Sequence, residues 1–253
     1  MRVLVTRPEP AATRTAEKLV ALGHVPILLP LSRARHDPQA ALRALNGSSA
    51  RRGASQAGGQ PSSPPCVIAV TSAEALRALE SLGEALVPHL SRPLFAVGQA
   101  TAAMAKSLGF RDIVTGEGNG ADLAAAIARA PQASAGVIYL AGRPRARGLE
   151  DALCAAGIPL SVAVCYTMQP LDYERAAVEA RLSSSVPQAV LVYSGETARA
   201  LITLLQGDIL SDLSRQMTWH PLSPAIAGVL PATLSVAEPP ARPDEDLLLA
   251  TLA

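Results

Sequence analysis

Short apolar runs alternate with amphipathic segments along most of the chain. Several of these runs end on Gly, Ser or Thr, and a segment with helical periodicity follows directly. The runs are residues 3–6, 67–72, 94–98, 137–142 and 190–194. Runs of this length between amphipathic helices are typical of parallel strands that are covered on both faces. The pattern predicts an α/β fold built on doubly wound parallel sheets.

The amphipathic segments and some weaker runs supply the remaining elements. Helices are expected over residues 10–22, 38–45, 73–82, 101–108, 120–130, 148–156, 173–182 and 196–205. Further strands are expected at residues 25–29 and 113–114 and near 219–222 and 233–236, and further helices at 224–230 and 244–252. Strand alternates with helix almost throughout, which is the order that a doubly wound sheet requires.

Two extended segments interrupt this alternation. Residues 30–38 are polar, and residues 158–169 are longer than an ordinary strand of about five or six residues. Both suit antiparallel connectors on which the chain leaves one domain and later returns to it, with a cleft between the two domains. The expected division is residues 1–30 plus 170–253 for lobe one, 38–160 for the inserted lobe two, and 31–37 and 161–169 for the inter-lobe linkers.

Residues 46–65 differ in composition from their surroundings. They are rich in Gly, Ser, Pro and Gln and include Arg51 and Arg52. Such a segment buries too little apolar surface to offset its conformational entropy, so we expect a disordered surface insertion.

Bulk composition narrows the class of protein. The 253 residues carry a net charge of +1, so no basic stripe for nucleic acid dominates. The three cysteines, Cys66, Cys154 and Cys165, are widely spaced, which argues against a disulfide framework. No apolar stretch approaches the ~20 residues of a membrane span, and the first residues lack signal-peptide features. We therefore expect a cytoplasmic protein with no membrane or nucleic-acid partner.

Motifs for common cofactors are missing from the expected places. No Gly-x-Gly-x-x-Gly or Walker sequence follows any of the apolar runs, so the chain lacks the usual nucleotide-binding loops. The four histidines, His24, His36, His89 and His220, have no metal-ligand spacing. Neither a metal nor another cofactor is expected.

A series of short motifs gives the chain a family resemblance. In order along the sequence they are Val5-Thr6-Arg7-Pro8, Gly23 with Pro26 and Pro30, Thr71-Ser72-Ala73, Val97-Gly98 with Thr101-Ala102, Gly142-Arg143 with Leu149, Leu153 and Gly157, Val164-Cys165-Tyr166, and Ser194. Each motif alone is weak, but together they resemble uroporphyrinogen-III synthases over essentially the whole chain. The resemblance implies two flavodoxin-like doubly wound parallel-sheet lobes joined by a two-stranded extended linker.

The resemblance also implies an activity. Uroporphyrinogen-III synthase is a cofactor-independent lyase that cyclises hydroxymethylbilane, with inversion of the terminal pyrrole ring and loss of water, in tetrapyrrole biosynthesis. The implied partners are this substrate and the enzymes acting before and after it, which form the bilane and decarboxylate the product. Because two lobes that share a cleft need no second copy, a monomer is expected.

Candidate substrate-binding residues lie where the apolar runs end. The bilane carries acetate and propionate groups, and helix N-termini at the carboxyl ends of strands favour anions. The candidates of this kind are Thr6, Ser72, Gly98, Thr101, Gly142 and Ser194. Arg7 and Arg143 could each grip a carboxylate in bidentate fashion. The alternative is ordinary helix caps and solvated arginines.

Tyr166 is the candidate catalytic residue, in the place where the family has its proposed acid. A tyrosine, with a pKa near ~10, stays protonated at neutral pH and can donate a proton to the departing hydroxyl group. The alternative is a structural tyrosine at the end of a strand.

Departures from the family pattern leave a second function open. Glu74 stands where the family often has Asn, and Ser223-Pro224-Ala225 replaces its usual Gly and Thr-Ala element. The chain could therefore be a non-catalytic relative that binds tetrapyrroles or other anions. A third interpretation, a two-lobed sugar- or nucleotide-binding enzyme, predicts stabilisation by nucleotides.

Overall fold

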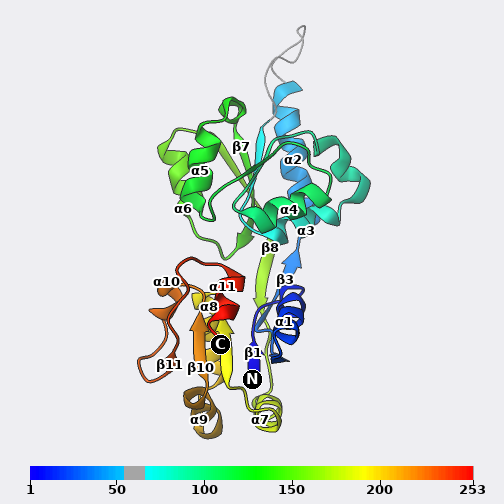
Figure 1. Cartoon of the computed structure of the whole chain (residues 1–253). Coiled ribbons are helices and arrows are strands. Elements are labelled where there is room, and N and C mark those ends of the chain that lie inside the picture. The colour runs from blue at the N-terminus through cyan, green and yellow to red at the C-terminus, as the bar shows by residue number, and fades with distance from the viewer. Residues whose placement is uncertain (54–65, 253) are drawn as a thin grey trace. The chain divides into compact units, whose positions relative to one another are not determined.

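The computed structural model describes residues 1–53 and 66–252, which form an α/β protein with parallel sheets and covering helices (Figure 1). The chain divides into two compact units. The first combines Met1–Arg33 with Gln169–Ala253, and the second is Ala34–Met168. Among the described residues, no helix is long and apolar enough to cross a membrane.

The first unit is built on a parallel sheet. Within the described residues its strands lie in the order β11-β10-β9-β1-β2, and every neighbouring pair is parallel. Their bounds are Arg2–Val5 (β1), Val25–Leu28 (β2), Ala189–Val192 (β9), Thr218–Pro221 (β10) and Ser235–Val236 (β11). Numbered along the chain, this is the 2-1-3-4-5 order of flavodoxin.

Alternate residues of the interior strand β1 face opposite layers of helices. Leu4 belongs to a core with α7 (Arg175–Ser184), α8 (Gly195–Leu204) and α9 (Asp208–Gln216). Val3 and Val5 belong to a separate core with α1 (Ala11–Ala21) and α11 (Glu245–Ala250). A short helix, α10 (Pro224–Ala227), follows β10. Because both faces are covered, β9 is apolar throughout and β1 is apolar from Val3 to Val5, without the alternation of a half-exposed strand.

The second unit has a sheet of different order. Within the described residues its strands lie as β3-β8-β7-β4-β5-β6. Their bounds are Ser32–His36 (β3), Val67–Val70 (β4), Leu94–Ala96 (β5), Ile113–Thr115 (β6), Val137–Arg143 (β7) and Leu160–Pro170 (β8). From β4 to β8 the pairs are parallel. Numbered along the chain these five strands have the order 3-2-1-4-5, because the chain makes two crossovers outward from β4 before returning to its other side. The flavodoxin order expected here is therefore wrong for this sheet, although the sheet is doubly wound.

Helices cover both faces of the second sheet as well. Ile68 and Val70 of β4 pack in a core with α2 (Pro38–Gly53), α3 (Ala73–Glu80) and α4 (Gln99–Ser107). Val67 and Ala69 pack on the opposite side with α5 (Gly120–Ala128) and α6 (Gly148–Ala155), which lie together on that side in Figure 1. Two 3-10 helices, η1 (Gly83–His89) and η2 (Pro131–Ala135), complete the connections.

The two strands β3 and β8 pair with opposite directions. The backbone N–H of Asp37 donates to the carbonyl of Cys165, and the N–H of Leu171 donates to the carbonyl of Leu31. Residue numbers rise on one strand as they fall on the other, which is the antiparallel arrangement. The same register places His36 opposite Tyr166.

Helix α2 corrects the expectation for residues 46–65. The helix was expected to end at residue 45, before a disordered insertion, but it continues to Gly53. Residues 50–52, Ala-Arg-Arg, have high helix propensity, and a helix that is already nucleated can extend through less favourable residues at small cost. The rest of the expected insertion, residues 54–65, lies outside the described residues.

Candidate functional site

One group of the predicted site residues lies at the carboxyl ends of four parallel strands. Strands β5, β4, β7 and β8 are neighbours in register, so the segments after them meet at the same edge of the second sheet. Of the predicted residues, Ser72 and Gly98 lie on the segments after β4 and β5, whereas Gly142 and Tyr166 lie within β7 and β8, in their carboxyl-terminal parts. Ligands bind at this edge in open α/β sheets, so it is the candidate site of the second unit.

Tyr166 is set at this edge by an irregularity in the strand pairing. Ala141 of β7 pairs with Val164, but Gly142 pairs with Tyr166, so the register shifts by one residue between them. The half-buried Tyr166 ring lies directly over Gly142: a Cβ atom at Gly142 would be 2.1 Å from the ring carbon Cζ and 2.4 Å from the hydroxyl oxygen. Bulges of this kind re-aim side chains beside active sites.

The surroundings of Tyr166 keep its phenol protonated. Burial raises the pKa of Tyr166, a hydrogen bond with the Ser72 side chain acts in the opposite direction, and electrostatic interactions with Tyr139, Cys165 and Glu74 raise it again. A neutral phenol at physiological pH can donate a proton, which is the role expected of the candidate acid.

The helix N-termini at this edge differ in whether a side chain already caps them, and this decides how readily their N–H groups can bind an anion. Ser72 caps α3, since its Oγ accepts the Glu74 N–H at 3.1 Å. Gly98 caps α4 without any side-chain hydrogen bond, and the buried Thr101 lies in the first turn of that helix. The first-turn N–H groups of α4 are therefore better placed to receive a carboxylate than those of α3.

Arg143 and its neighbour Arg145 have different surroundings. Arg143 is exposed at the end of β7, and no ion pair of its side chain occurs within the described residues. Arg145 makes two hydrogen bonds to Glu150, from Nε to Oε1 at 2.6 Å and from Nη2 to Oε2 at 3.3 Å. Arg143, unlike Arg145, thus has no internal carboxylate partner within the described residues.

The remaining predicted residues, Thr6, Arg7 and Ser194, belong to the carboxyl edge of the first sheet. Thr6 follows β1, and its hydroxyl is buried without a partner among the described residues. Ser194 caps α8, where its Oγ accepts the Thr197 N–H at 3.1 Å. Arg7 has an internal carboxylate partner, Glu245.

The Glu245 carboxylate binds donor groups from three other segments of the chain. Its Oε1 accepts from Arg7, from Thr15 at 2.7 Å and from the Tyr193 hydroxyl at 2.9 Å, and its Oε2 pairs with Lys18 at 3.1 Å. The Arg7 guanidinium also lies over the Tyr193 ring, 4.0 Å from its centre. Arg7 is therefore engaged in holding helix α11 to the first sheet and is not poised to bind a substrate carboxylate.

Burial by itself would raise the pKa of Glu245, but the hydrogen bond from Thr15, the charge of Arg7 and the hydrogen bonds from Lys18 and Tyr193 together lower it. A lowered pKa in the folded state stabilises the protein above the ordinary carboxyl range, and this contribution is lost as the pH falls through the folded-state value.

Glu245→Gln is expected to reduce the free energy of unfolding by about 1–3 kcal/mol at pH 7, because hydrogen bonds to a charged group are replaced by weaker ones. The difference from the parent should vanish in acid, where Glu245 is protonated in both folded and unfolded chains. Urea unfolding at pH 7 and at a pH low enough to protonate Glu245 in the folded chain measures both values. Glu238→Gln, at an exposed position, is the control. A loss that is equal at both pH values would contradict the charge network.

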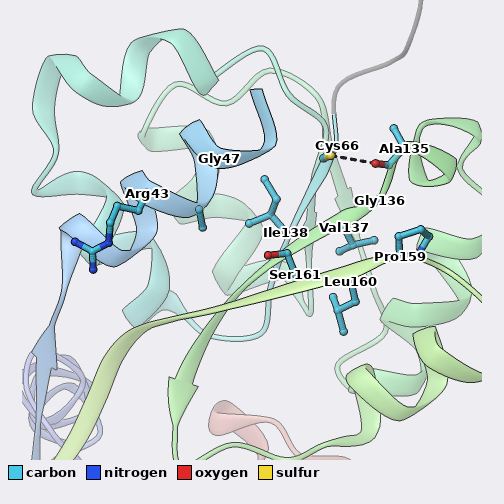
Figure 2. A pocket seen from close by; sticks show the side chains of 11 residues that line it. Arg43, Gly47, Cys66, Ala135, Gly136, Val137, Ile138, Pro159, Leu160 and Ser161 are labelled. Atoms are coloured by element: carbon cyan, nitrogen blue, oxygen red, sulfur yellow. Dashed lines mark hydrogen bonds between the residues drawn. The ribbon is translucent and has the colours of Figure 1, made fainter. Parts of the chain in front are cut away.

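A separate cavity lies at the opposite edge of the second sheet (Figure 2). Its volume is about 470 Å³, and its lining includes Val137 and Leu160, the first residues of β7 and β8. The Cys66 thiol beside it donates to the Ala135 carbonyl at 3.1 Å. Since Arg43 is the charged side chain of its described lining, the cavity lacks the paired acid and anion-binding groups of the carboxyl edge.

Sequence reasoning missed a cluster beside the candidate acid. Glu74 of α3 pairs with His36 of β3 and with Arg77 of its own helix. The spacing of Glu74 and Arg77 is visible in the sequence, but the contact with His36 depends on a distant strand. Within residues 1–53 and 66–252, no group of three or more His, Cys, Asp or Glu side chains is arranged to hold a metal ion.

Comparisons with known proteins give the family. The model of the HEM4 family, uroporphyrinogen-III synthase HemD, matches residues 13–230. The uroporphyrinogen-III synthetase of Helicobacter pylori 26695 is 15% identical with a TM-score of 0.59, covering 100% of this chain and 98% of that one. A mutant uroporphyrinogen III synthase of Thermus thermophilus is 18% identical with a TM-score of 0.54, covering 100% and 96%. At these identities the structures establish a common fold, and no curated protein matches the sequence. Because the family match spans most of its length, the chain belongs to the uroporphyrinogen-III synthase family.

Proposed function

We propose that the protein is a working uroporphyrinogen-III synthase, a lyase that closes hydroxymethylbilane to uroporphyrinogen III with loss of water. The observation that carries the proposal is the family match over residues 13–230. Tyr166 supports it, because a protonated phenol at the carboxyl edge of a parallel sheet suits the acid step of this reaction.

The substrate is a flexible polyanion, so binding it is mainly an electrostatic task. Its acetate and propionate groups are received by the N-terminus of α4 at Gly98 and Thr101 and by the exposed guanidinium of Arg143. Each exposed helix terminus contributes roughly 0.3–1 kcal/mol, and a bidentate arginine contributes direction as well as charge. Ser72 and Ser194 belong to weaker sites of the same kind, because their side chains already cap their own helices.

The chemical step needs a proton at the leaving hydroxyl group. Tyr166 donates it, water departs, and an electron-poor azafulvenium cation remains. The far pyrrole ring attacks through its substituted carbon, and the resulting spiro intermediate re-closes with that ring inverted. Without an enzyme the same compound closes to the type I isomer without inversion, so the protein's contribution is to hold the chain in the conformation that favours inversion.

The proposed organisation follows the family. The two units are lobes joined by a two-stranded linker, which consists of β3 and β8. The protein acts as a cytoplasmic monomer between a bilane-forming enzyme and a decarboxylating enzyme.

The second candidate function is a non-catalytic tetrapyrrole- or anion-binding relative. Its support is the segment Ser223-Pro224-Ala225 after β10, which departs from the usual Gly and Thr-Ala element. Ser223 makes no side-chain cap to α10. A binder of this kind would keep tetrapyrrole affinity without changing the isomer ratio.

Product analysis separates the two candidates. Freshly made hydroxymethylbilane is incubated with the pure protein, oxidised, and resolved into type I and type III porphyrins. Predominant type III is the expected result. A parallel incubation with heat-denatured protein measures the spontaneous reaction. Type I formed at that spontaneous rate would reject the synthase and favour the binder.

A further inference from the structure

A charged cluster lies next to the candidate acid in the second unit. Glu74 is in the first turn of α3, two residues after the cap Ser72. Its Oε2 lies 2.8 Å from Nε2 of His36, and its Oε1 pairs with Arg77. The Glu74 side chain is only 12% exposed and that of His36 27% exposed. One carboxylate thus orients an imidazole and a guanidinium in a largely dehydrated place.

His36 and Tyr166 occupy facing positions of the β3–β8 pair. The bonds at Asp37–Cys165 and Leu31–Leu171 fix the register, and the positions between hydrogen-bonded pairs are those whose side chains approach most closely. Residues opposite each other in an antiparallel pair share a face of the sheet, with Cβ atoms roughly 4.5–5.5 Å apart. The side chains of His36 and Tyr166 therefore start from neighbouring positions on one face of the sheet, and Glu74, which holds the imidazole, also acts electrostatically on Tyr166.

Glu74 is an unexpected residue at an edge that receives a polyanion. A free carboxylate there would repel the substrate, but this one is matched by Arg77 and by His36 when the imidazole is protonated. The contact with His36 indicates a different role for Glu74, because a carboxylate bonded to one ring nitrogen fixes the orientation of a histidine.

We propose that His36, oriented by Glu74, is a positioning residue for Tyr166 and restores its proton during the reaction. The inference rests on the proposed function. When the C–O bond of the hydroxymethyl group breaks, its electron pair stays on oxygen, and the Tyr166 proton converts that group to water. The imidazolium of His36 then gives its proton to the phenolate. The proton released when the closing pyrrole regains aromaticity returns to the neutral imidazole, so no outside acid is consumed.

A double-mutant cycle tests whether His36 acts through Tyr166. His36→Ala is expected to lower kcat by about 10–100-fold with KM little changed, which is a part of the 10²–10⁴-fold that general acid catalysis supplies. In a Tyr166→Phe background the same change should cost nothing more, because the group that it serves is gone. Glu74→Gln should act in the same direction as His36→Ala.

Added imidazole separates the proton role from a structural one. It is expected to restore part of the activity of His36→Ala and none of the activity of the double variant. His24→Ala is the matched control, since His24 belongs to the first unit and contacts the N-terminal amino group. Parental kcat in His36→Ala, a change confined to KM, or losses that multiply in the double variant would overturn the inference. Wild-type protein that forms only type I product would instead overturn the proposed function itself.

Discussion

Tyr166→Phe is expected to lower the rate of type III formation by about 10²–10⁴-fold, the range that a positioned general acid contributes. The substitution removes one oxygen from a half-buried ring and leaves its packing over Gly142 in place. The fold and the affinity for tetrapyrroles should therefore persist, and the loss should fall on kcat. Product analysis of the variant should show type I isomer at the spontaneous rate.

A second tyrosine provides the control for this experiment. Tyr173 donates its hydroxyl to the Pro30 carbonyl at 2.7 Å and belongs to the first unit. Tyr173→Phe should keep the parental rate, since its phenol has no part in the proposed chemistry. An unchanged type III rate in Tyr166→Phe would remove Tyr166 from the mechanism and leave positioning and electrostatics as the sources of catalysis.

The pH dependence of the parent offers an independent check on the acid. Burial raises the pKa of Tyr166, so its phenol stays protonated through the neutral range and beyond the ordinary tyrosine value near ~10. Loss of activity through ionisation of this group should therefore begin only at higher pH than for an exposed tyrosine.

Much of the fold was predictable because the strands are apolar on both faces. All residues of β4 and β9 are buried, so each is a continuous run of Val, Ile, Leu and Ala that stands out between amphipathic helices. The polar strand β3, Ser-Arg-Ala-Arg-His, lacks this signal because it pairs at the edge of its sheet and is only half covered. The sequence predicts an extended connector here, and the structure adds its place as the edge strand of the second sheet.

The order of the strands in a sheet is harder to predict from the sequence than the strands themselves. The strands β4, β5 and β7 are all short buried apolar runs, and nothing in their local sequence tells whether the next strand is added on one side of β4 or the other. The second sheet therefore differs from the expected flavodoxin order, although both orders bring strand ends to a common edge.

Site residues were predictable where they follow a strand and not where they need a distant partner. Ser72, Gly98 and Gly142 stand at strand ends, and the parallel register alone brings them to one edge. The Arg7–Glu245 and His36–Glu74 contacts join residues far apart in sequence. A carboxylate partner for Arg7 was expected from the substrate, but the fold supplies one from its own helix α11.

Gly142→Ala is expected to lower the type III rate by roughly 10²-fold, the loss that follows a misplacement of about 1 Å at a reacting group. Glycine is needed here for space, since the added methyl carbon would lie 2.1 Å from Cζ of Tyr166. Both residues lie on paired strands of the sheet, so relief comes mainly from swinging the phenol away from its position. Overpacking of this kind also costs about 1–3 kcal/mol of stability, which thermal unfolding would measure.

Two comparisons identify displacement of Tyr166 as the cause of that loss. Gly148→Ala is the matched control, because a methyl group there meets nothing within 4 Å, and it should keep the parental rate. In a Tyr166→Phe background, Gly142→Ala should add little, since the hydroxyl that it would displace is already absent. Parental activity in Gly142→Ala would mean that the phenol need not stand over β7. A large additional loss in the double variant would mean that the strand end itself, with Arg143 beside it, contributes to binding independently of the acid.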